Sequence, residues 1–142
     1  EMCIRDSTET ARISDHEVAA TILNELRSIG VRISMDDFGV GAANYEAFYE
    51  LPFDEIKIDR MFVANIAKDP KARAIVASIA AMGRGARITV VAEGLENPQD
   101  IPLLQEAGCQ QVQGFAFSRP LSLSNLLEYQ ELAPEQTLSN IV

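Results

Sequence analysis

Two adjacent aspartates, Asp36 and Asp37, mark the part of the sequence best suited to chemistry. They follow the apolar run of residues 31–35 and precede the turn Gly39-Val40-Gly41. Buried strands rarely end in two charges, because each charge costs several kcal/mol to desolvate unless it is paired or bound to a metal. Carboxylate oxygens are the ligands that hard divalent cations prefer. The pair is therefore a candidate metal site.

The composition indicates a globular domain and limits the class of ligand. The chain has 142 residues, 47% of them hydrophobic, and a net charge of −9. Because no basic stripe is present to neutralise phosphates, we expect no nucleic-acid polymer as a partner. The negative charge of the chain still allows a small anionic ligand, provided that metal ions bridge the ligand to carboxylates. No apolar run approaches the roughly 18 residues of a membrane span, so we expect a cytoplasmic segment without a secretory leader or direct membrane contact.

The cysteines and the histidine argue against thiolate or imidazole chemistry. Cys3 and Cys109 lie far apart and lack metal-ligand spacing. We interpret both as free thiols in a reducing compartment, with Cys109 a small buried hydrophobe. The single histidine, His16, stands at the start of a predicted helix, and we expect it to be a solvated surface residue. A histidine-based triad and a histidine-rich zinc site are therefore disfavoured.

Local signals predict alternating helices and strands. Ser14 and Glu17 form a capping box, and Asp69-Pro70 and Asn97-Pro98 are helix starts. The predicted strands are residues 31–35, 55–58, 88–92 and 112–117. The predicted helices are residues 14–29, 45–50, 69–84, 97–107 and 122–132.

This order of short buried strands and amphipathic helices predicts a parallel α/β fold. The polar residues that stand out follow or end strands: Asp36, Asp37, Lys57, Glu93 and Gln113. Barrels of the (β/α)8 type and open doubly wound sheets both build sites at the carboxyl ends of their strands. A (β/α)8 barrel typically needs about 250 residues, so four strands are half of one.

The two ends of the chain do not fit this pattern. Residues 1–7 mix charged and apolar side chains without a usable period. We interpret them as a non-native leader and exclude them from the fold; the alternative is a genuine strand. We expect residues 133–142 to be a loosely ordered tail.

Four segments together resemble the EAL domain of bacterial cyclic-di-GMP phosphodiesterases. The segments are Asp36-Asp37-Phe38-Gly39, Lys57-Ile58-Asp59, Ala92-Glu93-Gly94-Leu95-Glu96, and Gln113-Gly114-Phe115 with Ser118-Arg119-Pro120-Leu121. Each segment is weak evidence alone, but their order and approximate spacing are those of the family. The resemblance covers residues 8–132 and corresponds to the C-terminal half of that domain. It implies a partial (β/α)8 TIM-like barrel that lacks the family's Glu-Ala-Leu motif and the asparagine-bearing strand after it.

The resemblance also implies residue roles. The implied metal ligands for two Mg²⁺ or Mn²⁺ ions are Asp36, Asp37 and Glu93. The implied catalytic residues are Lys57, Glu93 and Gln113; Glu96 is implied near the substrate, and Glu9 is implied to steady the loop after the aspartates. The implied reaction is hydrolysis of cyclic-di-GMP to the linear dinucleotide, in which two metal ions offset the charge of the phosphodiester. Alternative roles stay open for three of these residues: Lys57 as a solvated strand lysine, Gln113 as a satisfied buried amide, and Glu96 as a surface charge near a helix start.

Departures from the family keep alternatives open. The loop Val40-Gly41-Ala42-Ala43-Asn44 stands where the family usually has Thr-Gly-Tyr-Ser-Ser. Asp6 occupies the position of another metal-binding glutamate, but it lies in the excluded leader, so we do not assign it. We therefore expect this fragment alone to be inactive. The alternatives are a degenerate domain that binds cyclic-di-GMP or a protein partner without turnover, and an unrelated half-barrel enzyme with a divalent metal. The longer protein from which this fragment comes, here called the parent, has two candidate partners: a second copy of itself, and an upstream regulatory or cyclase domain. Membrane tethering of the parent is also compatible with this sequence.

Overall fold

A parallel β-sheet forms the centre of the protein in a computed structural model that describes residues 4–7, 16–41 and 44–126. The strands are β1 (Ile4–Ser7), β2 (Arg32–Phe38), β3 (Glu55–Ile58), β4 (Thr89–Ala92) and β5 (Gln111–Val112). They lie in the order β1-β2-β3-β4-β5, and each pairs in parallel with its neighbour. The predicted parallel α/β architecture is confirmed.

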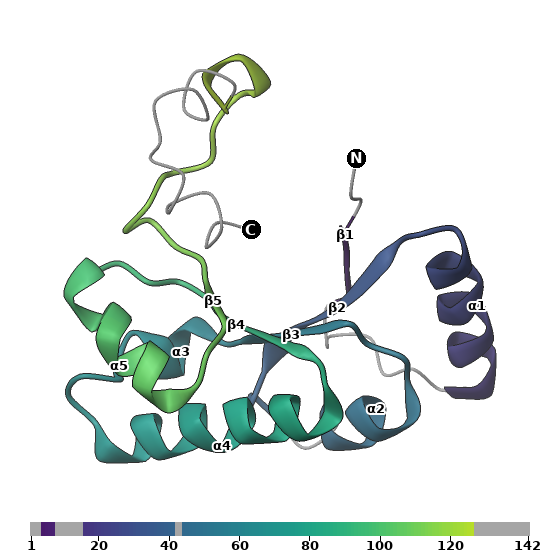
Figure 1. Cartoon of the computed structure of the whole chain (residues 1–142), viewed down its shortest axis with the longest axis horizontal. Coiled ribbons are helices and arrows are strands. Elements are labelled where there is room, and N and C mark those ends of the chain that lie inside the picture. Colours follow the sequence, from purple (N-terminus) through teal and green to yellow (C-terminus); the bar gives the residue numbers. More distant parts are fainter. Residues whose placement is uncertain (1–3, 8–15, 42–43, 127–142) are drawn as a thin grey trace.

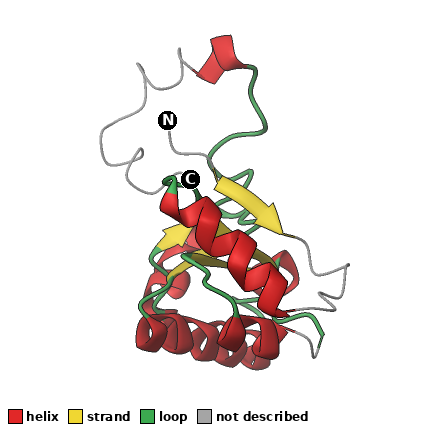
Figure 2. Cartoon of the chain, turned by 90° about the vertical axis from the view of Figure 1, so that its right-hand side faces the viewer, coloured by secondary structure: helices red, strands yellow, loops and turns green. Residues whose placement is uncertain are grey.

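Helices connect the strands and cover one face of the sheet. They are α1 (His16–Ser28), α2 (Asn44–Glu50), α3 (Arg60–Val63), α4 (Pro70–Ala86), the 3-10 turn η1 (Pro98–Asp100) and α5 (Ile101–Ala107). Figure 1 shows α2, α3 and α4 on the same side of the sheet, and Figure 2 shows the same layering from the side. The carboxylate of Asp69 accepts a hydrogen bond from the Lys71 N–H at 2.8 Å, and Pro70 begins α4 as predicted. The opposite face of the sheet, here called the polar face, carries Glu55 and Lys57 together with the buried Val91.

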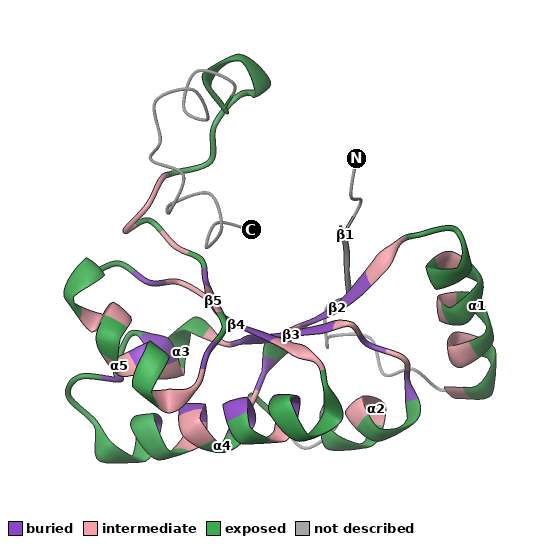
Figure 3. Cartoon of the chain, in the orientation of Figure 1, coloured by how far each residue is buried: buried purple, intermediate pink, exposed green. Residues whose placement is uncertain are grey.

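The hydrophobic core lies between the sheet and α4. Ile56 and Ile58 of β3 and Val76 of α4 are fully buried in one apolar cluster. Figure 3 shows that burial is concentrated in the strands and along one side of α4, whereas α1 contributes no fully buried residue. The core therefore fixes β3 and β4, the two central strands that support the polar face.

The helical spacing of Val18, Ile22, Leu26 and Ile29 predicts one packed face of α1, but of these four residues only Leu26 packs against the core. Val18 and Ile22 are about half exposed, and Leu23 is partly buried instead. Leu23, one position after Ile22, also fits the period of a helix. The sequence alone therefore does not select which apolar stripe of α1 packs against the core.

The exclusion of residues 1–7 from the fold was wrong. Ile4–Ser7 forms β1 and pairs with β2, with Asp6 opposite Ser34. An edge strand gains its backbone hydrogen bonds from one neighbour, and that pairing does not require an apolar period. The interpretation of residues 1–7 as a non-native leader stays a prediction, and the tail at 133–142 lies outside the described residues.

The last predicted strand is shorter than expected. Strand β5 ends at Val112, and the chain turns at Gly114, where the Phe117 N–H donates to the Gly114 carbonyl at 3.1 Å. A Cβ on Gly114 would stand 2.2 Å from the Leu95 carbonyl oxygen, so the glycine permits the loops after β4 and β5 to touch. This close contact diverts the chain from the sheet.

The remaining expectations concern membrane contact and thiols. Within the described ranges, no helix combines the length and apolarity needed to cross a membrane. Cys109 is buried and free, as predicted, and burial raises the pKa of its thiol to about 11. Cys3 lies outside the described residues.

Two glycines of α4 offer a matched test of this packing. A Cβ on Gly83 would lie 2.2 Å from Val90 Cγ2, whereas a Cβ on Gly85 would meet nothing within 4 Å. We expect Gly83→Ala to destabilise the protein by about 1–3 kcal/mol through overpacking. Gly85→Ala should instead stabilise it by up to about 1 kcal/mol, because alanine is the better helix former. Denaturant unfolding followed by circular dichroism measures both; equal effects of the two variants would contradict the close contact between α4 and β4.

Candidate functional site: a carboxylate cluster at the ends of β2 and β4

A β-bulge in β2 places the two aspartates. Met35 pairs with Ile56 and Phe38 pairs with Ile58, so Asp36 and Asp37 together stand opposite the single residue Lys57. The bulge absorbs one extra residue, which returns Phe38 to the face packed by the helices. Strand β2 was expected to end at Met35 with a loop from Asp36; that boundary was wrong, because the strand continues through the bulge to Phe38.

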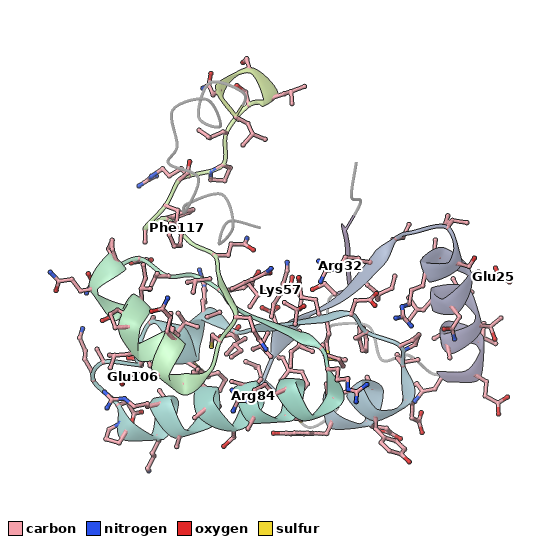
Figure 4. All side chains as sticks on the ribbon, viewed as in Figure 1. Glu25, Arg32, Lys57, Arg84, Glu106 and Phe117 are labelled. Atoms are coloured by element: carbon pink, nitrogen blue, oxygen red, sulfur yellow. The ribbon has the colours of Figure 1, made fainter. Side chains whose placement is uncertain are left out.

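Three carboxylates converge at this end of the sheet. One oxygen each of Asp36, Asp37 and Glu93 lie within 4.8 Å of one another. The Lys57 Nζ lies 3.2 Å from Glu93 Oε1, and the lysine is buried. Figure 4 shows Lys57 on the side of the sheet opposite α4. The structure thus brings together four of the residues that the sequence singled out.

The electrostatics of Glu93 reflect this crowding. Burial raises the pKa of its carboxyl above the ordinary value, and the neighbouring Asp36 carboxylate raises it further. The Lys57 ammonium opposes both effects and lowers the pKa of Glu93. Burial therefore sets the direction of the shift, and the Lys57 ammonium is the main charge that opposes it.

The backbone at the cluster is held in conformations that few residues adopt. Asp37 has φ = 52°, in the left-handed region. Non-glycine residues in that region are uncommon, aspartate being one of those that tolerate it, and they concentrate at functional sites. Gly39 follows with φ = 107°, and a Cβ there would stand 2.8 Å from Phe62 Cε2. The sequence Asp37-Phe38-Gly39 is therefore locked between the bulge and α3.

The loop after β4 is tied to the loop after β5. The Gln113 N–H donates to the Ala92 carbonyl at 2.8 Å, and the Leu95 N–H donates to the Gln113 carbonyl at 3.0 Å. These bonds hold the backbone of Gln113 beside Glu93, although the Gln113 residue is exposed. Glu96 is exposed on the same loop, outside the carboxylate cluster. Glu9 lies outside the described residues, so its expected role stays a prediction.

A buried polar network beneath the cluster was not predicted. Glu55, two residues before Lys57 on the same face of β3, is 1% exposed. It accepts a hydrogen bond from the Ser34 hydroxyl at 2.9 Å, and its carboxylate lies 3.7 Å from an Arg32 guanidinium nitrogen. The alternation of Arg32, Ser34 and Asp36 along β2 is the sequence signal for this polar face. Figure 4 shows Arg32 on the same side of the sheet as Lys57.

The donor set fits a hard divalent cation. All three clustered ligand residues supply carboxylate oxygens, which suit Mg²⁺, Mn²⁺ or Ca²⁺. Asp36 and Glu93 are half-buried and Asp37 is exposed, so a cation could reach the cluster from solvent and offset the charge of its carboxylates.

Substitution of Lys57 tests how far its ammonium group lowers the pKa of Glu93. In Lys57→Met the ammonium that lowers the pKa of Glu93 is absent, while burial and Asp36 remain, so the pKa of Glu93 should rise further. A pH titration of the ¹³C carboxyl resonance of Glu93 by NMR measures the change. Lys71→Met, an exposed lysine of α4, is the matched control and should leave this pKa unchanged. An unaltered Glu93 titration in Lys57→Met would show that Lys57 is not the compensating charge.

Comparison with known proteins assigns this arrangement to a family. Residues 6–120 match the model of the EAL domain. The chain is 39% identical over 124 residues to the bifunctional diguanylate cyclase/cyclic di-GMP phosphodiesterase MucR of Pseudomonas aeruginosa, covering 87% of this chain and 18% of MucR. The sequence thus spans less than a fifth of that relative's length.

Solved structures agree with the sequence match. The EAL domain of Mycobacterium smegmatis DcpA superposes with a TM-score of 0.86 at 32% identity, covering 92% of this chain and 60% of that domain. A manganese and cyclic-di-GMP complex of Klebsiella pneumoniae BlrP1 superposes with a TM-score of 0.75 at 36% identity, covering 82% of this chain and 30% of that one. The EAL fold is a TIM barrel, which confirms the expected fold class. The chain belongs to the EAL domain family and is a fragment of that domain.

Proposed function

We propose that this chain is the C-terminal half of a phosphodiesterase domain that hydrolyses cyclic-di-GMP to the linear dinucleotide. The observation that carries the proposal is the convergence of Asp36, Asp37 and Glu93 beside Lys57 at one end of a parallel sheet. The similarity to MucR, a bifunctional diguanylate cyclase/cyclic di-GMP phosphodiesterase, and to BlrP1 in its complex with manganese and cyclic-di-GMP supports it.

The three carboxylates are the residues of this chain that would hold Mg²⁺ or Mn²⁺. Divalent cations at such a site supply positive charge for a phosphodiester and lower the pKa of a bound water. Asp36 and Asp37 come from the bulge of β2, and Glu93 follows β4, so the central strand β3 lies between the ligands. The spacing of the strands therefore sets the spacing of the ligands.

Lys57 and Glu93 are the pair suited to proton and charge handling. The buried Lys57 ammonium adds positive charge where an anionic phosphate would approach, and its contact with Glu93 fixes its position. The raised pKa of Glu93 makes its carboxylate a better proton acceptor than an ordinary glutamate. In the proposal Gln113 contributes an amide at the rim of the site and Glu96 contacts the substrate side.

Metal binding is the first test of these assignments. We expect Asp36→Asn to weaken Mg²⁺ binding by roughly tenfold or more, because it removes a ligand rather than an outer partner. Isothermal titration with Mg²⁺ alone measures the affinity. Glu106→Gln, which removes one exposed charge from α5, should leave it unchanged. Equal affinities in the two variants would remove Asp36 from the set of ligands.

Hydrolysis tests the fragment and the parent separately. The 142-residue chain should not hydrolyse cyclic-di-GMP in the presence of Mg²⁺, because the family's Glu-Ala-Leu and asparagine ligands are absent from it. The parent domain, with the missing strands restored, should do so. Chromatographic detection of the linear dinucleotide checks both. Turnover by the chain alone would contradict its expected inactivity, and binding without turnover by the complete domain would favour the receptor alternative.

A further inference from the structure

A second group of metal-ligand side chains lies where α1 begins beside α2. It consists of His16, the first residue of α1, and of Glu46 and Glu50 on α2. One ligand atom from each of the three residues lies within 4.8 Å of the others. His16 Nδ1 is in contact with Glu50 Oε2. Figure 1 shows the start of α1 next to α2, although the two helices are separated by β2 in the sequence.

The two glutamates create a local excess of negative charge. Glu46 and Glu50 are four residues apart and therefore share one face of α2, where like charges repel. Glu50 is also the last residue of α2, whose final turn contains no basic residue. Carbonyl groups at a helix end carry partial negative charge and disfavour an anion there. The arrangement favours a cation between Glu46 and Glu50.

The donor set differs from that of the Asp36, Asp37 and Glu93 cluster. One imidazole nitrogen with two carboxylate oxygens is a set that Zn²⁺ binds, typically with a fourth position left for water. The other cluster offers oxygen alone and suits harder cations. The His16 side chain is 24% exposed and that of Glu50 is 42% exposed, so an ion can reach both from solvent.

We propose that His16, Glu46 and Glu50 form a second metal site, selective for Zn²⁺ or a similar transition-metal ion over Mg²⁺. The ion would join the start of α1 to α2, the helix that directly follows the loop after Asp36 and Asp37. The contact between His16 and Glu50 in the metal-free protein holds two of the three ligands in place. This site does not depend on the proposed phosphodiesterase function.

A simple ion pair between protonated His16 and Glu50 is the competing explanation. It uses the same contact but needs the proton on Nδ1, whereas a metal needs that nitrogen free. The expectation of a solvated His16 fits neither explanation, because the ring is largely covered and paired. Zinc titration separates the two, because a purely structural ion pair does not bind the metal.

His16 is the only histidine of the chain, which gives an unambiguous NMR reporter. The experiment titrates Zn²⁺ alone into the ¹⁵N-labelled chain, at a pH above the ordinary histidine pKa, and follows the imidazole nitrogens. The background carries Cys3→Ser and Asp36→Asn, which remove a thiol and a carboxylate that Zn²⁺ could bind elsewhere. We expect Nδ1 to shift to a metal-bound position with one Zn²⁺ per chain, and Mg²⁺ to produce no such shift.

Substitutions at two ligand positions and at one control position complete the test. Glu50→Gln and Glu46→Gln should each weaken Zn²⁺ binding by about tenfold or more, whereas Glu25→Gln on α1 should leave it unchanged. All three substitutions are at exposed positions, and amide-proton spectra verify that the fold is kept. The proposal is overturned if the His16 resonances do not respond to Zn²⁺, or if the two cluster variants bind as tightly as the control.

Discussion

The close approach of three carboxylates is the constraint on which the candidate site depends. Asp36, Asp37 and Glu93 come from β2 and from the loop after β4, which flank the central strand β3. Lys57 projects from β3 between them and provides the opposing charge. Holding like charges together requires rigid supports, and the parallel register of β2, β3 and β4 against the apolar layer of α4 provides them.

The backbone that holds Asp36 and Asp37 contains two features that are energetically unfavourable on their own. A non-glycine residue in the left-handed region costs of order 1–3 kcal/mol, and Asp37 is such a residue. The bulge also interrupts the pairing of β2 with β3. The fully buried Phe38 offsets these costs, because it packs edge-to-face against Tyr45 and Phe48 at centroid distances of 5.6 and 5.9 Å. Burial of Phe38 thus stabilises a backbone conformation at Asp37 that would be unfavourable alone.

The sequence predicts the elements with strong local signals and misses those that depend on distant partners. Strand 55–58 and the start of α4 at Asp69-Pro70 carry their own periodicity and cap, and both are confirmed. The bulge was missed, yet the spacing of buried Ile33, Met35 and Phe38, first two residues and then three, indicates it. The burial of Glu55 could not be read locally, because a glutamate in a strand is ordinarily exposed and its burial here depends on Ser34 and Arg32.

Two buried acceptors on the polar face of the sheet lack hydrogen bonds. Within the described part of the chain, Glu55 Oε2 and Gln111 Oε1 are buried without a hydrogen-bond partner. Both residues share this face with Lys57, since Gln111 pairs with Val91 and Val91 pairs with Lys57. A buried acceptor without a hydrogen bond is costly and rare in complete folds, and Glu55 Oε2 has only the 3.7 Å ion pair with Arg32 to offset that cost. Because the chain is a fragment of a barrel, the strands that complete it would cover this face. Closure of the barrel is therefore the step that we expect to supply hydrogen-bond partners for these two acceptors.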